Sequence, residues 1–261
     1  MKICNLASGS KGNCTWVSNQ GTNVLIDDGI SLRDLKNRIE GASLDLDLRR
    51  LNAIVITHEH SDHIKGLKML SKTYNIPVYM HKKSLQYVFD DEILRNIVDQ
   101  DMDKPFNIGD LGITPFRLPH DSAYNLGYKF DDGKNKFSIA TDLGFVSDKT
   151  LEVLKGSKMV MIEANHDLQM LRNGPYPAYL KHRIESKNGH LCNDDSANTS
   201  TSLCKSGTEY IMLAHLSQDN NTPEMAFECT TQKLAEDKII EGKDLMVDVA
   251  SQFRPSKIIK I

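Results

Sequence analysis

Thr57-His58-Glu59-His60-Ser61-Asp62-His63 is the stretch of sequence that decides the fold of this chain. It brings three imidazoles and the carboxylate of Asp62 into six positions, directly after the apolar run 51–56, which is typical of a buried strand. Helical spacing of apolar residues follows, at Ile64, Leu67, Leu70 and Tyr74. The stretch is therefore predicted to form a strand-to-helix turn, where its side chains converge.

The residue types in this turn are those that bind metal ions. His58 and His60 are two positions apart on extended chain and project to the same side. Asp62 and His63 begin the helix and can face a second point nearby. Neutral imidazole and carboxylate are ligands of zinc, manganese and iron, so we interpret the turn as part of a site for two close ions. The alternative is a polar turn that happens to be rich in histidine, but three of the nine histidines fall here.

Length and composition set broad limits on fold and function. The chain has 261 residues, enough for one large domain or two small ones. Hydrophobic residues make up 39% and charged residues 26%, which is an ordinary soluble composition. A net charge of −3 does not indicate a nucleic-acid binder. It does not exclude a polyanionic substrate either, because bound divalent ions would add positive charge at the site.

Cysteine usage and the N-terminus predict a cytoplasmic protein. The five cysteines are odd in number, scattered and without a C-x-x-C pair, so we expect reduced thiols with no disulfide partner. The first residues contain no apolar signal-peptide core, and no stretch approaches the ~18 apolar residues of a membrane span. The sequence does not indicate an oligomeric state.

Short strands and helices alternate without a linker or repeat, which predicts a single domain over residues 1–261. Strands are expected at 3–6, 15–18, 23–27, 51–56, 77–80, 116–118, 128–130, 137–140, 159–162, 210–214 and 245–249. Helices are expected at about 32–39, 64–74, 84–89, 167–203 and 223–238. Two strand-rich halves with helices outside fit this order best.

Three polar residues end apolar strands further along the chain. His120 follows 116–118, Asp142 follows 137–140, and His215 follows 210–214. Taken alone, each of these residues is as consistent with the capped end of a strand as with a metal ligand. Together with the turn at 57–63, they are predicted to complete a two-metal centre at one edge of the sheets.

These features resemble the metallo-β-lactamase superfamily. The H-x-H-x-D-H pattern is matched by His58, His60, Asp62 and His63, and the later motifs by His120, Asp142 (in Thr141-Asp142-Leu143-Gly144) and His215. The resemblance implies an α/β fold, the αββα sandwich of two mixed sheets with helices outside. It also implies that one ion binds His58, His60 and His120. The second would bind Asp62, His63 and His215, with Asp142 bridging. Zinc or manganese would suit these ligands, and iron is possible.

Other stretches resemble the YycJ-type branch of this superfamily. They are 8–13, 25–27, 163–167, 174–177, 189–191 and 215–223, and with them the resemblance spans essentially the whole chain. This branch comprises bacterial cytosolic metallohydrolases with reported or proposed DNA exonuclease activity, which implies a nucleic-acid substrate. The chain departs from the branch at Asp28, where a small residue is usual, and at Cys192, where serine is common. Because Cys192 lies near His190, its departure concerns substrate preference.

The implied chemistry is hydrolysis by a shared hydroxide. Two ions ~3.5–4 Å apart can hold a hydroxide near neutral pH and clamp the oxygens of an in-line displacement. Asp62 can orient that hydroxide as well as bind metal. The leaving alkoxide then needs a proton, and His190 and His166 are the two candidate donors. Resemblance to the tRNA-processing nucleases favours His190, whose alternative is a surface histidine, while His166 could instead be a ligand.

Two further readings of the site stay open. The same hydroxide would also hydrolyse a small ester, thioester or lactam. A low-turnover, metal-bound regulatory protein is the third possibility, although retention of every expected ligand argues against it. Loop 8–13 is either a phosphate cradle or a simple connection, and the remaining histidines, His81 and His182, are expected to be ordinary.

Overall fold

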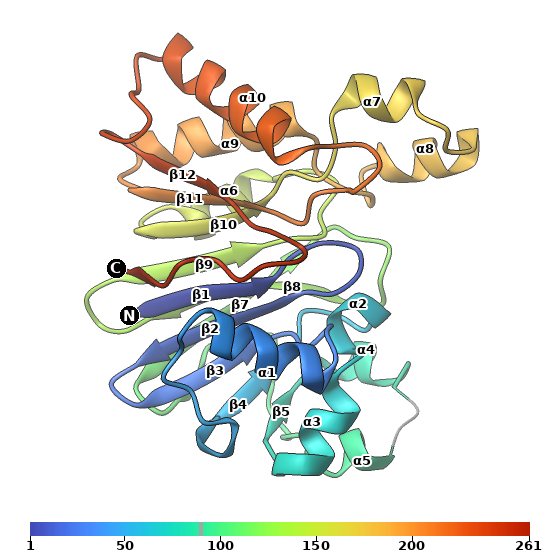
Figure 1. The fold of residues 1–261 in the computed structure, drawn as a ribbon, viewed down its shortest axis with the longest axis vertical. Helices are drawn as coiled ribbons and strands as arrows, with labels where there is room; N and C mark the ends of the chain where they lie inside the picture. Colours follow the sequence, from blue (N-terminus) through green and yellow to red (C-terminus); the bar gives the residue numbers. More distant parts are fainter. Residues whose placement is uncertain (89–90) are drawn as a thin grey trace.

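The computed structural model describes residues 1–88 and 91–261, and two β-sheets packed face to face form its centre (Figure 1). The first sheet has the order β13 (Ile259–Lys260), β1 (Lys2–Ala7), β2 (Cys14–Asn19), β3 (Thr22–Ile26), β4 (Ala53–Val55) and β5 (Val78–Tyr79). The second has the order β12 (Met246–Val249), β11 (Tyr210–Ala214), β10 (Met159–Glu163), β9 (Lys136–Ala140), β8 (Asn125–Asp131), β7 (Leu111–Leu118) and β6 (Phe106–Ile108). Each sheet contains both parallel and antiparallel pairs.

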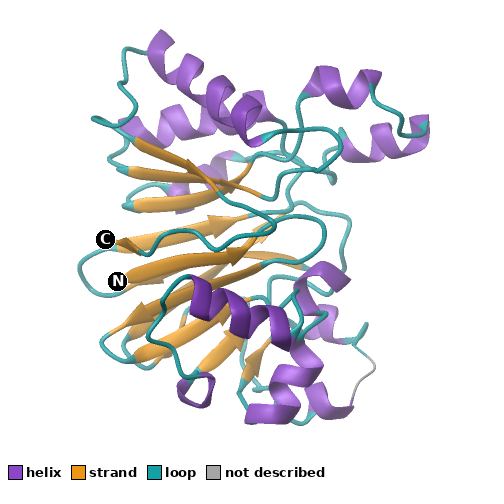
Figure 2. Ribbon diagram, in the orientation of Figure 1, coloured by secondary structure: helices purple, strands orange, loops and turns teal. Residues whose placement is uncertain are grey.

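Helices cover the outer face of each sheet (Figure 2). Those between β3 and β6 are α1 (Leu32–Gly41), the 3₁₀ turn η1 (Leu48–Arg50), α2 (Ser61–Ile64), α3 (Leu67–Tyr74), α4 (Lys82–Leu85) and α5 (Asp91–Leu94). Those after β9 are α6 (Asp148–Leu154), α7 (Leu168–Asn173), α8 (Ala178–Ile184), α9 (Asn193–Lys205) and α10 (Pro223–Glu236). The predicted αββα sandwich with two mixed sheets is therefore confirmed.

Three layers of buried apolar side chains hold the sandwich together. Between the sheets, the aromatic rings of Tyr128 and Phe130 pack against residues of the first sheet such as Val17. A second layer joins the first sheet to α1 and α3, and a third joins the second sheet to α9 and α10. The strands are apolar on both faces because each sheet is buried on both sides.

Three predicted helices are wrong in extent. The helix expected at 64–74 is divided between α2 and α3, because Gly66 packs so closely on Ile30 that a Cβ there would lie 1.9 Å from the Ile30 carbonyl oxygen. The helical tract expected at 167–203 is three helices, interrupted by the segments 174–177 and 185–192. The helix expected at 84–89 is the shorter α4, and Phe89 lies outside the described residues.

The state of the thiols and the length of the helices are also defined by the structure. All five cysteines are free, so none forms a disulfide. Among residues 1–88 and 91–261, no helix combines the length and the apolar character needed to cross a membrane.

The register of the parallel strands sets where the functional residues lie. In the register of the sheet, Ile162 of β10 pairs with Ala140 of β9 on one side and with Leu213 of β11 on the other. The residues that follow these strands therefore leave the sheet at one edge, as expected for the carboxyl ends of parallel strands.

Candidate metal centre

The seven predicted ligands meet at this edge, although they come from four separate segments, which are the turn 57–63 and the loops after β7, β9 and β11. His58 and His60 follow β4, and Asp62 and His63 begin the short helix α2. The other three follow β7, β9 and β11, and they are His120, Asp142 and His215. Most of these side chains are buried, and their ligand atoms are already gathered in the fold.

The ligand atoms form the two groups that the sequence predicts. Those of His58, His60 and His120 lie within 4.8 Å of one another. Those of Asp62, His63 and His215 do the same. Asp142 forms a group with His58 and His63, one member of each set, and this is where a bridging carboxylate would lie.

Four of the five predicted histidine ligands have one ring nitrogen within hydrogen-bond distance of an oxygen atom of the protein. Nδ1 of His58 lies 3.0 Å from the Thr57 hydroxyl, and Nδ1 of His120 lies 3.1 Å from the Gly189 carbonyl oxygen. Carboxylates hold the other two: Nδ1 of His63 is 2.8 Å from Asp27, and Nδ1 of His215 is 2.7 Å from Glu163. Such outer contacts orient metal-binding imidazoles.

Three inward-facing atoms of the site make no hydrogen bond to the described residues. Nε2 of His58, Nε2 of His215 and Oδ2 of Asp142 are buried and have no hydrogen-bond partner within the described part of the chain. Buried polar atoms without a partner are costly, and bound metal would satisfy all three. The donor set therefore fits divalent metal.

The electrostatics of the site favour cationic charge next to its carboxylates. Burial opposes a charged imidazole at His63, yet the carboxylates of Asp27, Asp142 and Asp62 raise its pKa well above the usual value. Burial also opposes ionisation of Asp62, but His63 holds the pKa of this carboxyl well below its usual range. The carboxylates thus stay ionised and require cationic charge nearby, which divalent ions supply.

Backbone strain accompanies the site. Asp142 has a φ of 61°, His215 of 55° and Asp27 of 59°. These left-handed conformations are unfavourable for residues other than glycine and recur at functional sites. The turn after each strand bends the chain sharply enough to aim these side chains at the centre.

Glu163 is a central residue that sequence reasoning did not assign. It ends β10 and is fully buried, and its Oε1 lies 2.8 Å from Nδ1 of His190 and 2.7 Å from Nδ1 of His215. Its Oε2 accepts hydrogen bonds from the backbone N–H of Leu143 and Leu191. The same strand-end pattern that singled out Asp142 would have found it.

Glu163→Gln is expected to weaken metal binding about 10- to 100-fold, because the amide loses the negative charge that orients His215. A metal titration of the variant measures this, with the exposed Glu236→Gln as the matched control. Equal affinity in both variants would show that Glu163 does not support the centre.

The two candidate proton donors differ in position. The His190 ring lies 5.1 Å from the His120 ring and 5.3 Å from the His215 ring, between centroids, so it borders the centre. Burial lowers the pKa of His190, but Glu163 outweighs it and the pKa is raised overall. His166 is buried beside Cys192, and burial lowers its pKa. It belongs to none of the metal groups found among the described residues, so its role stays a prediction.

The hydrogen bonds of loop 8–13 favour the reading as a simple connection over the phosphate cradle. The backbone N–H of Gly9 donates to Asn13 Oδ1, that of Lys11 to Gln252 Oε1, and that of Gly12 to the Gly9 carbonyl oxygen. The N–H of Asn13 donates to the Asp62 carbonyl oxygen. Because these groups already have partners, they cannot bind a phosphate as a cradle does.

Asp28 is a buried acid without partners. Both carboxylate oxygens lack a hydrogen bond within residues 1–88 and 91–261. Burial, with a smaller effect of Asp27, raises the pKa of Asp28 to about 8. This is the position where the sequence departs from the YycJ-type pattern of a small residue.

Asp28→Ala is expected to change how stability depends on pH. The pKa of Asp28 is about 8 in the folded chain and about 4 in the unfolded chain, so the folded state holds the proton more tightly. The stability contributed by protonated Asp28 is therefore complete below about pH 4 and is lost as the pH rises from about 4 to about 8. The loss amounts to at most about 1.4 kcal/mol per pH unit. The difference in free energy of unfolding between variant and wild type should therefore be more favourable to the variant at pH 8 than at pH 5. Chemical denaturation of metal-loaded protein at both values measures this, and a pH-independent difference would contradict it.

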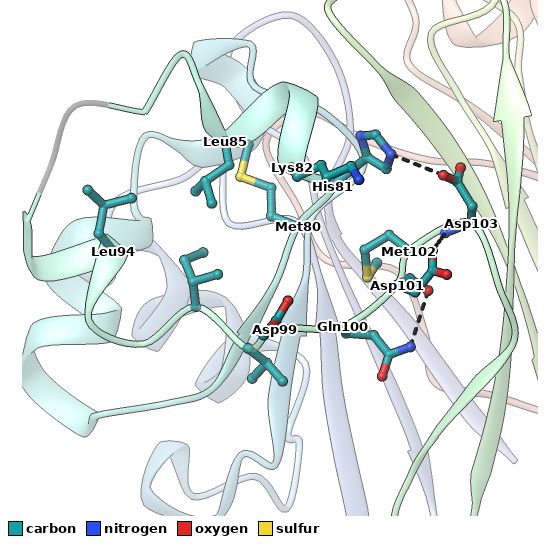
Figure 3. A pocket seen from close by; sticks show the side chains of 12 residues that line it. Met80, His81, Lys82, Leu85, Leu94, Asp99, Gln100, Asp101, Met102 and Asp103 are labelled. Carbon is teal, nitrogen blue, oxygen red and sulfur yellow. Dashed lines mark hydrogen bonds and ion pairs between the residues drawn. The ribbon is translucent and has the colours of Figure 1, made fainter.

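A separate cavity of about 650 Å³ lies beside α4 and the loop 98–103 (Figure 3). None of the described residues that line it is one of the seven predicted ligands. His81 lies on its wall, 3.5 Å from Asp103, and stacks on Tyr124 with ring centroids 3.6 Å apart. His81 is therefore held in a structural contact, as predicted for an ordinary histidine.

Comparison with known proteins places this centre in a family. The family model described as "Beta-lactamase superfamily domain" matches residues 22–215. The chain belongs to the metallo-β-lactamase superfamily. Its YycJ-type character is also shown: it is 36% identical to "Exodeoxyribonuclease YycJ" of Bacillus anthracis, over 97% of this chain and 96% of that protein. It is 34% identical to "Exodeoxyribonuclease WalJ" of Streptococcus pneumoniae, over 93% of this chain and 91% of that protein.

Solved structures of the superfamily share the fold at low identity. The metallo-β-lactamase fold protein YhfI of Bacillus subtilis superposes with a TM-score of 0.71 at 14% identity, covering 98% of both chains. Human tRNase Z, short form, superposes with a TM-score of 0.64 at 18% identity, covering both chains completely at 100%. Membership of the superfamily, together with the histidine and aspartate groups, makes this chain a metal-dependent hydrolase that binds divalent metal.

Proposed function

We propose that this metallo-β-lactamase superfamily member hydrolyses phosphodiester bonds of DNA as an exonuclease, with two divalent ions. The observation that carries the proposal is the hydrogen-bonded pair of Glu163 and His190 beside the ligand groups. A hydrolase with a good leaving group does not need a proton donor there, whereas expulsion of a sugar alkoxide does. The naming of the YycJ and WalJ relatives as exodeoxyribonucleases supports DNA as the substrate.

The proposed ligand sets follow the groups in the structure. His58, His60 and His120 would hold one ion, and Asp62, His63 and His215 the other. Asp142 would contact both ions, since its side chain groups with a histidine of each set. All-nitrogen and oxygen ligation suits zinc or manganese, with iron possible. Bound ions would polarise a phosphate oxygen and lower the pKa of a water molecule.

The protein's own groups would then position the reactants and move the proton. The carboxylate of Asp62 is ionised and one-fifth exposed, so it can accept a hydrogen bond from the attacking water. His190, protonated through its contact with Glu163, would deliver a proton to the leaving oxygen. Its side chain is 18% exposed, which leaves it open to a bound substrate.

A side-by-side assay tests the proposal. Purified protein is loaded with Zn²⁺ or Mn²⁺, its metal content is measured, and single-stranded DNA, duplex DNA, RNA and a β-lactam are offered separately. Shortening of DNA from its ends, with two ions per chain, is the expected result. Turnover of the acyl substrate alone would support the small-ester or lactam alternative. Full metal occupancy with no hydrolysis at all would support the regulatory alternative.

We further propose a cytoplasmic location. Five free cysteines, three of them buried, suit a reducing compartment, and a bacterial exonuclease would meet its substrate there.

A further inference from the structure

An exposed phenylalanine lies beside loop 8–13, whose Asn13 contacts the predicted ligands Asp62 and His63. Phe253 is 66% exposed, and it lies in the loop after β12, beside loop 8–13 (Figure 1). The ammonium group of Lys11 lies 6.0 Å from the centre of its ring, and the neighbouring Arg254 is exposed as well. The ring is therefore open to solvent and lies near a cation, so it is free to contact a bound partner.

The loop that carries Phe253 is held firmly in place. The Ser251 hydroxyl accepts hydrogen bonds from the backbone N–H of Phe253 and of Arg254. Gln252 accepts from the Lys11 N–H and donates to the Gly12 carbonyl oxygen. The ring is thus presented by a preorganised loop, which reduces the entropy lost when a partner binds.

A hollow lies between this ring and the segment that follows His215. It has a volume of about 400 Å³, and Phe253, Ser8 and Leu216 line it together with polar groups such as Ser217. The Ser8 hydroxyl accepts a hydrogen bond from the backbone N–H of His215, 2.8 Å away. The volume falls within the range of about 300–1,000 Å³ typical of small-ligand pockets, so a nucleotide unit fits.

We infer that Phe253 and Lys11 form a platform for single-stranded DNA, on which a base stacks while the strand passes beside His215. The inference rests on the proposed nuclease function. Every base has a π-face, so an aromatic ring binds a strand without choosing its sequence, and a nearby cation contacts the phosphates. A strand seated in the hollow would lie against Leu216, the residue that follows the predicted ligand His215.

The test compares variants of Phe253 in the metal-loaded enzyme. Phe253→Leu keeps an apolar side chain but removes the ring, and should raise KM for single-stranded DNA about 5- to 100-fold with a smaller change in kcat. Phe253→Trp keeps a stacking face and should retain a KM close to wild type. Tyr87→Ala removes an aromatic ring of 61% exposure that lines neither the hollow nor the metal centre, and serves as the matched control.

Binding measured without cleavage separates the platform from the nuclease function. A fluorescent phosphorothioate oligothymidine, which resists hydrolysis, is titrated with each variant. Lys11→Ala should reduce the slope of log affinity against log salt by about 0.7, the value for one phosphate contact on a single strand. Weaker binding by Phe253→Leu in a protein that cleaves no DNA would support the platform while overturning the nuclease function.

Two results would overturn the platform itself. One is wild-type DNA cleavage with equal KM and equal oligonucleotide affinity in Phe253→Leu. The other is a change of oligomeric state in Phe253→Leu with no change in DNA affinity, which would make this surface a contact between copies of the chain.

Discussion

Asp142→Ala is expected to remove bound metal and to lower the hydrolysis rate by at least about a thousandfold. The carboxylate groups with His58 and His63, so its loss deprives both proposed ions of a ligand. Metal ions stabilise transition-state charge by several kcal/mol, and each 1.36 kcal/mol corresponds to about tenfold in rate. Metal analysis of the purified variant and its rate on DNA measure both effects.

The backbone at this position calls for a second variant. Asp142 has a φ of 61°, which alanine adopts less readily than asparagine. Asp142→Asn keeps the local conformation and removes the charge, so metal loss in this variant cannot be attributed to misfolding. The exposed Asp45→Ala is the matched control and should keep its metal. Two ions per chain in both Asp142 variants would refute the bridging role.

His190→Ala is expected to keep its metal and to slow DNA cleavage about 10²- to 10⁴-fold, the range for general acid catalysis. The imidazole is bound to Glu163 through Nδ1, which leaves Nε2 to donate a proton. Glu163 raises the pKa of His190 against the effect of burial, and this favours the protonated form needed in an acid.

The leaving group distinguishes acid catalysis from a structural role. A p-nitrophenyl phosphodiester releases a stable anion that needs no proton, so His190→Ala should lose much less activity on it than on DNA. The exposed His182→Ala is the control and should retain both activities. An equal loss on both substrates would make His190 a structural residue, and no loss on either would remove it from the mechanism.

The helix predictions failed where a local pattern met a tertiary contact. The apolar spacing from Ile64 to Tyr74 is that of one helix, but the backbone at Gly66 donates a hydrogen bond to the Asp28 carbonyl oxygen and the helix divides there. The tract 167–203 contains Pro175 and Pro177, and these prolines account for the break between α7 and α8.

The sequence by itself determined the strand-to-helix turn at 57–63, the strand ends at His120, Asp142 and His215, and with them the superfamily. It could do so because the ligand types are rare and each follows an apolar strand. Only the tertiary structure decided that Glu163 joins His190 to His215, and that Asp27 holds His63. These partners are 27 to 52 positions apart along the chain, and they meet only because the register of the strands brings their ends to one edge.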